Sequence, residues 1–176
     1  MRSWLLVPVD SARALECARA SGADVLVLNL ADSVGSEAPA AARERVCAFM
    51  ASNCAIPRDS RVFVRIHGLR TAAARSDLET VMRTAPDGIV LPDCDGGRDV
   101  ARLDAMLTVC EAEFGLPDLS TGIVAEATAR AEALFGLGSY RGASRRLTGL
   151  AWDGAGLAAD LGSTAARDAG GALSDP

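Results

Sequence analysis

The sequence predicts an α/β fold assembled from parallel strand–helix units. Short runs of apolar and β-branched residues recur along the chain, and an Ala-rich segment with helical spacing follows each run. This alternation is typical of βα units, in which a helix connects each strand to the next parallel strand. The runs that predict strands are Trp4–Val7, Val25–Leu30, Val62–Ile66, Gly88–Leu91, Thr121–Ala125 and Leu147–Trp152.

Capping and helix-breaking residues mark the ends of the helices between these runs. Ser11 can cap a helix that continues through Ala20, and Gly22 lies just beyond its end. Proline and glycine end most of the others, because proline cannot continue a helix and glycine tolerates a left-handed cap. The remaining predicted helices are Glu37–Met50, Asp77–Thr84, Arg98–Phe114 and Thr128–Leu137.

The chain is long enough for one sizeable core. It has 176 residues, and no internal segment has the composition of a linker between domains. We therefore expect a single domain over residues 1–167. The last residues, 168–176 (DAGGALSDP), are small and polar, so we expect a flexible tail.

Composition and charge exclude several kinds of partner. The net charge is −5, and Arg145-Arg146 is the only pair of adjacent basic residues, so we expect neither nucleic acid nor an anionic membrane surface as a partner. No apolar run approaches the roughly 20 residues of a membrane span. The first residues lack the pattern of a signal peptide, and the five cysteines form no CxxC, so we expect a reducing, cytoplasmic location.

The chain contains no lysine, so every basic side chain is an arginine. Arginine stays protonated and cannot form a Schiff base with a carbonyl substrate. Aldolase chemistry through a lysine imine and covalent binding of pyridoxal phosphate are therefore excluded.

Polar residues follow the predicted strands, and in parallel α/β folds functional residues gather at that end of the sheet. A group of acids with an arginine suits a hard cation that holds an anionic substrate. Mg²⁺ takes one or two carboxylates together with waters and ligand oxygens, and arginine grips a carboxylate through two parallel hydrogen bonds. The residues at these positions are Asp10, Asn29, Asp32, Arg65, His67, Asp93, Asp95, Glu126 and Asp153.

Five segments, in order along nearly the whole chain, resemble the citrate lyase beta-subunit family of the HpcH/HpaI aldolase superfamily. They are RSWLLVPVDSARALECARASGADVLVLNLADSV, VFVRIHG, PDGIVLPD, IVAEA and LAWDGAGLAADLG. The resemblance implies a (β/α)8 TIM-barrel fold, here shortened to about six βα units. It also implies a Mg²⁺-dependent lyase that cleaves or forms a carbon–carbon bond in an acyl-CoA such as citryl-CoA or malyl-CoA, to or from an oxoacid and acetyl-CoA.

The resemblance assigns roles to three residues. Arg65 matches the family arginine that binds the substrate carboxylate, and Glu126 matches the glutamate that ligates Mg²⁺ and touches substrate. Asp32 matches the last acid of a D-L-E-D segment that holds metal-bound water. Asn29 and Ala31 stand where that segment has its other two acids, so the acidic patch is depleted.

The second metal ligand of the family, an aspartate, falls on Gly156, which has no side chain to offer. Asp153 lies three residues earlier and can replace that ligand only if the loop folds back, so we expect the metal to be held by Glu126 and Asp153. His67 stands where the family has asparagine, and we expect it to be a solvated loop residue rather than a general base.

Two functions are compatible with these residues. The first is a Mg²⁺-dependent carbon–carbon lyase of the citrate lyase beta-subunit type, with weak or lost activity because a metal ligand is missing. The second is a catalytically inactive homologue that acts as a binding or scaffold protein. Six strands leave two open edges in a parallel sheet, so in either case we expect a homo-oligomer.

Overall fold

Six parallel strands form one sheet, in which each strand pairs with its neighbours in chain order. The computed structural model describes residues 3–31, 39–52 and 60–163, so the predicted tail at 168–176 lies outside the described residues. All six predicted strands are confirmed, with ends that shift by a residue at most positions. They are β1 (Trp4–Pro8), β2 (Val25–Asn29), β3 (Arg61–Arg65), β4 (Gly88–Leu91), β5 (Gly122–Glu126) and β6 (Leu147–Ala151).

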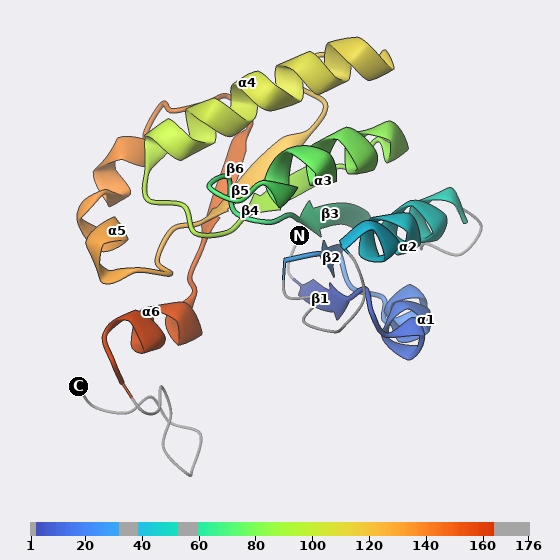
Figure 1. Cartoon of the computed structure of the whole chain (residues 1–176), viewed down its shortest axis with the longest axis horizontal. Helices are drawn as coiled ribbons and strands as arrows, with labels where there is room; N and C mark the ends of the chain where they lie inside the picture. Colours follow the sequence, from blue (N-terminus) through green and yellow to red (C-terminus); the bar gives the residue numbers. More distant parts are fainter. Residues whose placement is uncertain (1–2, 32–38, 53–59, 164–176) are drawn as a thin grey trace.

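Helices follow the strands as the sequence predicts, and α1 to α4 succeed one another around the outside of the sheet (Figure 1). The Ser11 hydroxyl caps α1 by accepting a hydrogen bond from the Ala14 N–H at 3.1 Å, which confirms the predicted start of that helix. The helices are α1 (Ala12–Ala20), α2 (Pro39–Ala51), α3 (Ala73–Val81), α4 (Gly97–Phe114), α5 (Ala131–Phe135) and α6 (Gly154–Asp160), with short 3-10 turns η2 (Met82–Thr84) and η3 (Leu137–Tyr140).

Two helices differ from the prediction at their ends. Helix α3 begins at Ala73, four residues before the predicted start at Asp77. Its N-cap residue, Ala72, makes no side-chain hydrogen bond, so the sequence contains no capping residue that marks this start. Helix α5 begins at Ala131 rather than Thr128, since Arg130 at its N-cap is extended. The helix predicted from Glu37 begins at Pro39 in the part of the chain that the structure describes.

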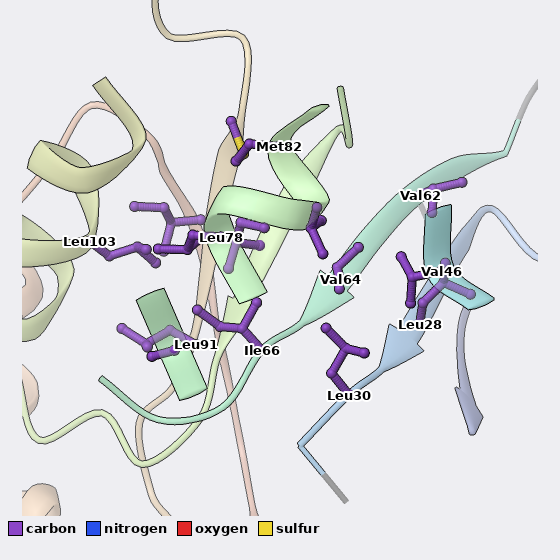
Figure 2. Close-up of a cluster of buried hydrophobic side chains, with 14 of the residues drawn as sticks. Leu28, Leu30, Val46, Val62, Val64, Ile66, Leu78, Met82, Leu91 and Leu103 are labelled. Carbon is purple, nitrogen blue, oxygen red and sulfur yellow. The ribbon is translucent and has the colours of Figure 1, made fainter. Parts of the chain in front are cut away.

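The outer face of the sheet, which the helices cover, carries the larger hydrophobic core. Figure 2 shows strand side chains such as Leu28, Val64 and Leu91 packed beneath helix side chains such as Val46 and Leu78. In α4 the buried side chains Val100, Leu103 and Leu107 recur at helical spacing, so one stripe of this long helix packs on the sheet. Successive side chains of a strand point to opposite faces of the sheet. The strand residues between these buried ones therefore lie on the inner face.

The inner face carries a second, smaller cluster, formed by side chains of four central strands and packed against Ala151. The Trp4 and Phe63 rings lie 5.1 Å apart between centroids on this face. The buried members of the cluster are Val25, Val27, Phe63, Val90 and Val124. On β2, β3 and β5 the next residue of the same parity toward the carboxyl end is polar, and these three residues form the candidate site.

The sheet does not close into a barrel over the described residues. Strands β1 and β6 are its two edges, and each pairs with one neighbour only in the described part of the chain. Helix α6 lies apart from the row formed by α1 to α4 (Figure 1), and none of its residues is buried. No helix in the described ranges is both long enough and apolar enough to cross a lipid bilayer.

Candidate active site at the carboxyl ends of the strands

Three polar side chains end the inner faces of β2, β3 and β5. Asn29 follows Val25 and Val27, Arg65 follows Phe63, and Glu126 follows Val124, each two residues further along its strand. Asn29 and Arg65 also lie opposite each other in the register of β2 and β3. Strand alternation therefore brings these side chains to the same mouth of the sheet, as the sequence predicts for a parallel fold.

Arg65 and Glu126 form a two-pronged ion pair. Arg65 Nε donates to Glu126 Oε1 at 2.7 Å, and Arg65 Nη2 donates to Glu126 Oε2 at 2.8 Å. The two side chains are 12% and 15% exposed, so the pair is shielded from water but still reachable from solvent. This geometry orients both groups firmly, because a guanidinium and a carboxylate match in shape when they pair through two parallel hydrogen bonds.

The main chain at Glu126 is held by the segment that follows β4. The Cys94 N–H donates to the Glu126 carbonyl oxygen at 3.2 Å, and the Tyr140 hydroxyl donates to the Cys94 carbonyl oxygen at 2.8 Å. Burial raises the pKa of the Cys94 thiol and that of the Tyr140 hydroxyl, so both stay protonated at neutral pH. These contacts fix the end of β5 and therefore the position of the Glu126 carboxylate.

Asn29 lies beside the ion pair, at the start of the segment that the resemblance describes as depleted of acids. Its side chain is buried, and its Oδ1 accepts a hydrogen bond from Arg65 Nη1 at 3.3 Å. The amide therefore supplies an oxygen to Arg65 without adding a negative charge. Asp32, predicted to take part in catalysis, lies outside the described residues.

Asp153 lies just after β6 and caps helix α6. Its Oδ1 accepts a hydrogen bond from the Gly156 N–H at 2.9 Å, and its own N–H donates to the Thr128 hydroxyl at 2.7 Å. A Cβ atom on residue 156 would overlap Asp153 Oδ2, and would lie 2.9 Å from Asp153 Cγ and 3.2 Å from Ala129 Cα. The Asp153 carboxylate thus occupies the space in which a side chain at position 156 would begin.

A second charged group lies on the same rim of the sheet. Asp95 pairs with both Arg70 and Arg130, which come from the segments after β3 and β5. Burial favours the neutral form of Asp95, but hydrogen bonds from Arg70 and Arg130 outweigh that effect and lower the pKa of the carboxyl group. Asp95 therefore connects three loops at the mouth of the site, a contact that its Asp- and Gly-rich surroundings in the sequence do not reveal.

His67 is not free in solvent, contrary to the expectation from its loop position. Its Nδ1 lies 2.7 Å from Asp77 Oδ2, and the same oxygen accepts a hydrogen bond from the His67 N–H at 2.9 Å. Asp77 is fully buried and also binds Arg43 Nε at 2.8 Å through Oδ1. Asp77 belongs to the buried stripe of α3 with Ala74, Leu78 and Val81, and a helix predicted to begin at Asp77 did not include the first residue of that stripe.

The oxygen donors at the rim suit a hard cation. Within residues 3–31, 39–52 and 60–163, no group of three or more His, Cys, Asp and Glu side chains is arranged so that it could hold a metal ion. Glu126 and Asp153 nevertheless offer two carboxylates, and one or two protein carboxylates are the usual share of a Mg²⁺ site whose other ligands are water and substrate. Asp153 Oδ2 makes no hydrogen bond to any described residue. These residues therefore fit a magnesium ion in the chemistry of their donors.

Two characterised proteins are similar to this chain in sequence. The chain is 32% identical over 124 residues to citrate lyase subunit beta of Escherichia coli (strain K12), an overlap of 70% of this chain and 40% of that subunit. It is 29% identical over 162 residues to (3S)-malyl-CoA thioesterase of Cereibacter sphaeroides, an overlap of 92% of this chain and 52% of the thioesterase. The chain thus spans about half or less of the length of these relatives.

A solved structure with the same fold holds a metal and an oxoacid. The citrate lyase beta subunit of M. tuberculosis, complexed with oxaloacetate and magnesium, matches 98% of this chain and 66% of its own chain, with 27% identity and a TM-score of 0.68. This confirms a fold of the TIM-barrel type. The profile of HpcH/HpaI aldolase/citrate lyase matches residues 2–171. The chain therefore belongs to the HpcH/HpaI aldolase/citrate lyase family.

Proposed function

We propose that this chain binds an oxoacid together with Mg²⁺ at the carboxyl ends of β3 and β5. We further propose that it acts on a 3-hydroxyacyl-CoA of the citryl-CoA or malyl-CoA kind as a carbon–carbon lyase with weak turnover. The observation that carries the proposal is the ion pair of Arg65 with Glu126, which lies at the rim of the inner face. The complex of the M. tuberculosis relative with oxaloacetate and magnesium supports the choice of ligands.

Each residue has a separate part in this proposal. Arg65 binds the carboxylate of the oxoacid, because a guanidinium matches carboxylates in shape and charge through its planar fork of N–H donors. Glu126 holds Arg65 in position and offers the remaining lone pairs of its oxygens to the cation. Asp153 offers Oδ2 as a second hard donor, and Asp32 is expected to hold metal-bound water.

Bound Mg²⁺ would supply electrostatic stabilisation of the enolate oxygen that forms when the carbon–carbon bond breaks. The chain's own residues bind the anionic end of the substrate and keep it in one orientation. The acyl-CoA would lie across the same mouth, near Arg70 and Arg130, which both pair with the carboxylate of Asp95.

A second candidate function is a catalytically inactive oxoacid-binding or scaffold protein. Gly156 at the position of the second family ligand favours it, since Asp153 is already engaged as a helix cap. The two candidates agree on binding through Arg65 and differ in whether acyl-CoA is cleaved.

Calorimetric titration with oxaloacetate in the presence of Mg²⁺ tests the binding that both candidates share. Arg65→Gln should weaken oxaloacetate binding by roughly 10- to 100-fold, because a charge-assisted hydrogen bond contributes about 1.5–3 kcal/mol. Arg61→Gln is the matched control, since Arg61 is an exposed arginine at the opposite end of the same strand. Equal affinity in wild type and Arg65→Gln would remove Arg65 from the site.

A further inference from the structure

A glycine-rich contact joins the turn η3 to the segment that connects β4 to α4. Gly96 and Gly97 lie in that segment, and Gly136 lies just before η3. A Cβ atom on Gly97 would overlap the Ser139 carbonyl oxygen, and a Cβ atom on Gly136 would lie 2.6 Å from the Asp95 carbonyl oxygen. Larger residues at these positions would therefore push η3 away from the rim of the sheet.

Two side chains of η3 form hydrogen bonds with this segment. The Ser139 hydroxyl accepts a hydrogen bond from the Gly97 N–H at 2.9 Å, at the first residue of α4. The Tyr140 hydroxyl donates to the Cys94 carbonyl oxygen at 2.8 Å, and the two residues are 3% and 1% exposed. A buried carbonyl oxygen is costly to leave unpaired, so Tyr140 holds Cys94 in place.

Cys94 connects Tyr140 to the candidate site. Its N–H donates to the Glu126 carbonyl oxygen at 3.2 Å, and the carboxylate of Glu126 pairs with Arg65. Cys94 thus has its carbonyl oxygen bound to η3 and its N–H bound to the end of β5. A displacement of Cys94 would move the main chain of Glu126 and, with it, the carboxylate.

The residues on either side of Cys94 show why this segment needs support. Asp93 has a φ of 50°, a left-handed conformation that is uncommon for a residue other than glycine. Such a conformation persists only where the surrounding contacts enforce it. Asp95 pairs with Arg70 and Arg130 at the same rim. The hydrogen bond from Tyr140 therefore fixes the residue between a strained position and a charged one.

We propose that Tyr140 is a positioning residue of the candidate site and acts on Glu126 through the main chain of Cys94. The inference rests on the proposed function, because it needs Glu126 to bind Mg²⁺ together with an oxoacid. Tyr140 is itself buried and bound to Cys94, so it is not a ligand. Loss of its hydroxyl lets Cys94 and the end of β5 shift, and the Glu126 carboxylate then moves out of line with Arg65 and the cation.

Tyr140→Phe tests this role, since it removes the hydroxyl and keeps the ring. In calorimetric titrations at saturating oxaloacetate, we expect the Mg²⁺ affinity to fall about tenfold, the lower end of the usual cost of losing an outer partner of a metal ligand. Ser60→Ala is the matched control, because the Ser60 hydroxyl donates to the Ala23 carbonyl oxygen at 2.6 Å, at the opposite ends of the strands. The control should lower the melting temperature without changing the Mg²⁺ affinity.

The outcomes separate this proposal from the proposed function. Equal Mg²⁺ affinity in wild type and Tyr140→Phe would overturn the proposal. An equal loss of affinity in Ser60→Ala would overturn it too, because any lost hydrogen bond would then weaken the site. Wild type that binds no Mg²⁺ with oxaloacetate would instead contradict the proposed function, and the role of Tyr140 would fall with it.

Hydrogen exchange of the Cys94 amide gives a second test that needs no variant. Coupling between two sites is reciprocal, so ligands that fix Glu126 should slow exchange of the Cys94 N–H. Saturating Mg²⁺ and oxaloacetate should slow it by a larger factor than the Arg61 N–H, which donates to the Asp24 carbonyl oxygen at 2.9 Å away from the site. Cys94 exchange that responds no more than that of Arg61 overturns the proposal.

Discussion

At the scale of single residues, the ion pair of Arg65 with Glu126 explains how one site can serve a cation and an anion together. Each charge is partly neutralised by the other in the free protein, which lets both stay largely buried. A bound oxoacid adds negative charge beside Arg65, and a cation adds positive charge beside Glu126. The two ligands should therefore strengthen each other's binding.

Asp153 can be tested as a ligand separately from its role as a helix cap. Asp153→Asn keeps an oxygen that can accept the Gly156 N–H, because asparagine caps helices as well as aspartate does. We expect Mg²⁺ affinity in the presence of oxaloacetate to fall at least fivefold, with no change in the melting temperature. Asp153→Ala should also lose about 1 kcal/mol of stability through the missing cap. Unchanged Mg²⁺ affinity in both variants would leave Asp153 as a cap alone.

Sequence reasoning placed Arg65, Glu126 and Asn29 at one mouth because strand parity and parallel order are properties of the pattern itself. It could not predict that Asp153 fills the space in front of Gly156, since a loop conformation depends on contacts such as that with Thr128. The partner of His67 was missed for a similar reason: Asp77 is near in sequence, but it lies on a helix that only tertiary packing brings beneath the ring.

At the scale of elements, a buried ion network joins α4 to the start of β6. Arg146 is 2% exposed and donates through Nη1 and Nη2 to the two carboxylate oxygens of Glu111, each at 2.6 Å, and through Nε to Asp104 at 2.6 Å. Glu111 also accepts the Thr121 N–H at 3.0 Å. Burial opposes the charged form of Glu111, but these hydrogen bonds prevail and lower the pKa of the carboxyl group.

This network makes stability depend on pH in a defined direction. Because the folded-state pKa of Glu111 lies below the ordinary value of 4.5, its contribution is present above that pH and is lost as the pH falls through the folded-state pKa. In urea titrations the free energy of unfolding should therefore decrease below pH 4.5 less steeply in Glu111→Gln than in wild type. At pH 7 the variant should be less stable by about 3 kcal/mol, because the buried Arg146 loses one of its carboxylate partners and keeps Asp104.

If the free energy of unfolding decreases below pH 4.5 as steeply in Glu111→Gln as in wild type, other carboxyl groups control the pH dependence. Asp118→Asn is the matched control, since Asp118 is 78% exposed in its side chain and lies 3.5 Å from the same arginine. It should behave like wild type.

The order and type of the elements were predictable, while some of their ends were not. Six apolar runs became six strands because each is short, β-branched and bounded by turn residues. Ser11 marked the start of α1 through a side-chain cap. Helix α3 begins without such a cap, so the Ala-rich residues before Asp77 gave no sign of where it starts.

At the scale of the whole molecule, the open edges of the sheet expose apolar side chains. Trp4 and Leu6 of β1 are 44% and 54% exposed, and Leu150 in β6 and Trp152 just beyond it are 48% and 67% exposed. Unpaired strand edges with apolar side chains favour pairing with another chain. Both the homo-oligomer and the single domain over residues 1–167 stay predictions.

Sedimentation velocity should therefore show that this chain is not a monodisperse monomer. Replacing Leu6 and Leu150 by arginine should shift the distribution toward the monomer, since charges at exposed edge positions oppose pairing. Val109→Arg is the matched control, because Val109 is 64% exposed on α4, away from both edges. A wild-type sample that sediments as one monomeric species would contradict the expectation.

The most direct test of the proposed site is calorimetric titration of Mg²⁺ into the protein with and without oxaloacetate. Mg²⁺ should bind more tightly when oxaloacetate is present, and Glu126→Gln should abolish this gain while Glu132→Gln, an exposed glutamate on α5, leaves it intact. Mg²⁺ binding that is absent from the folded wild type, or that is the same in Glu126→Gln, would contradict the account.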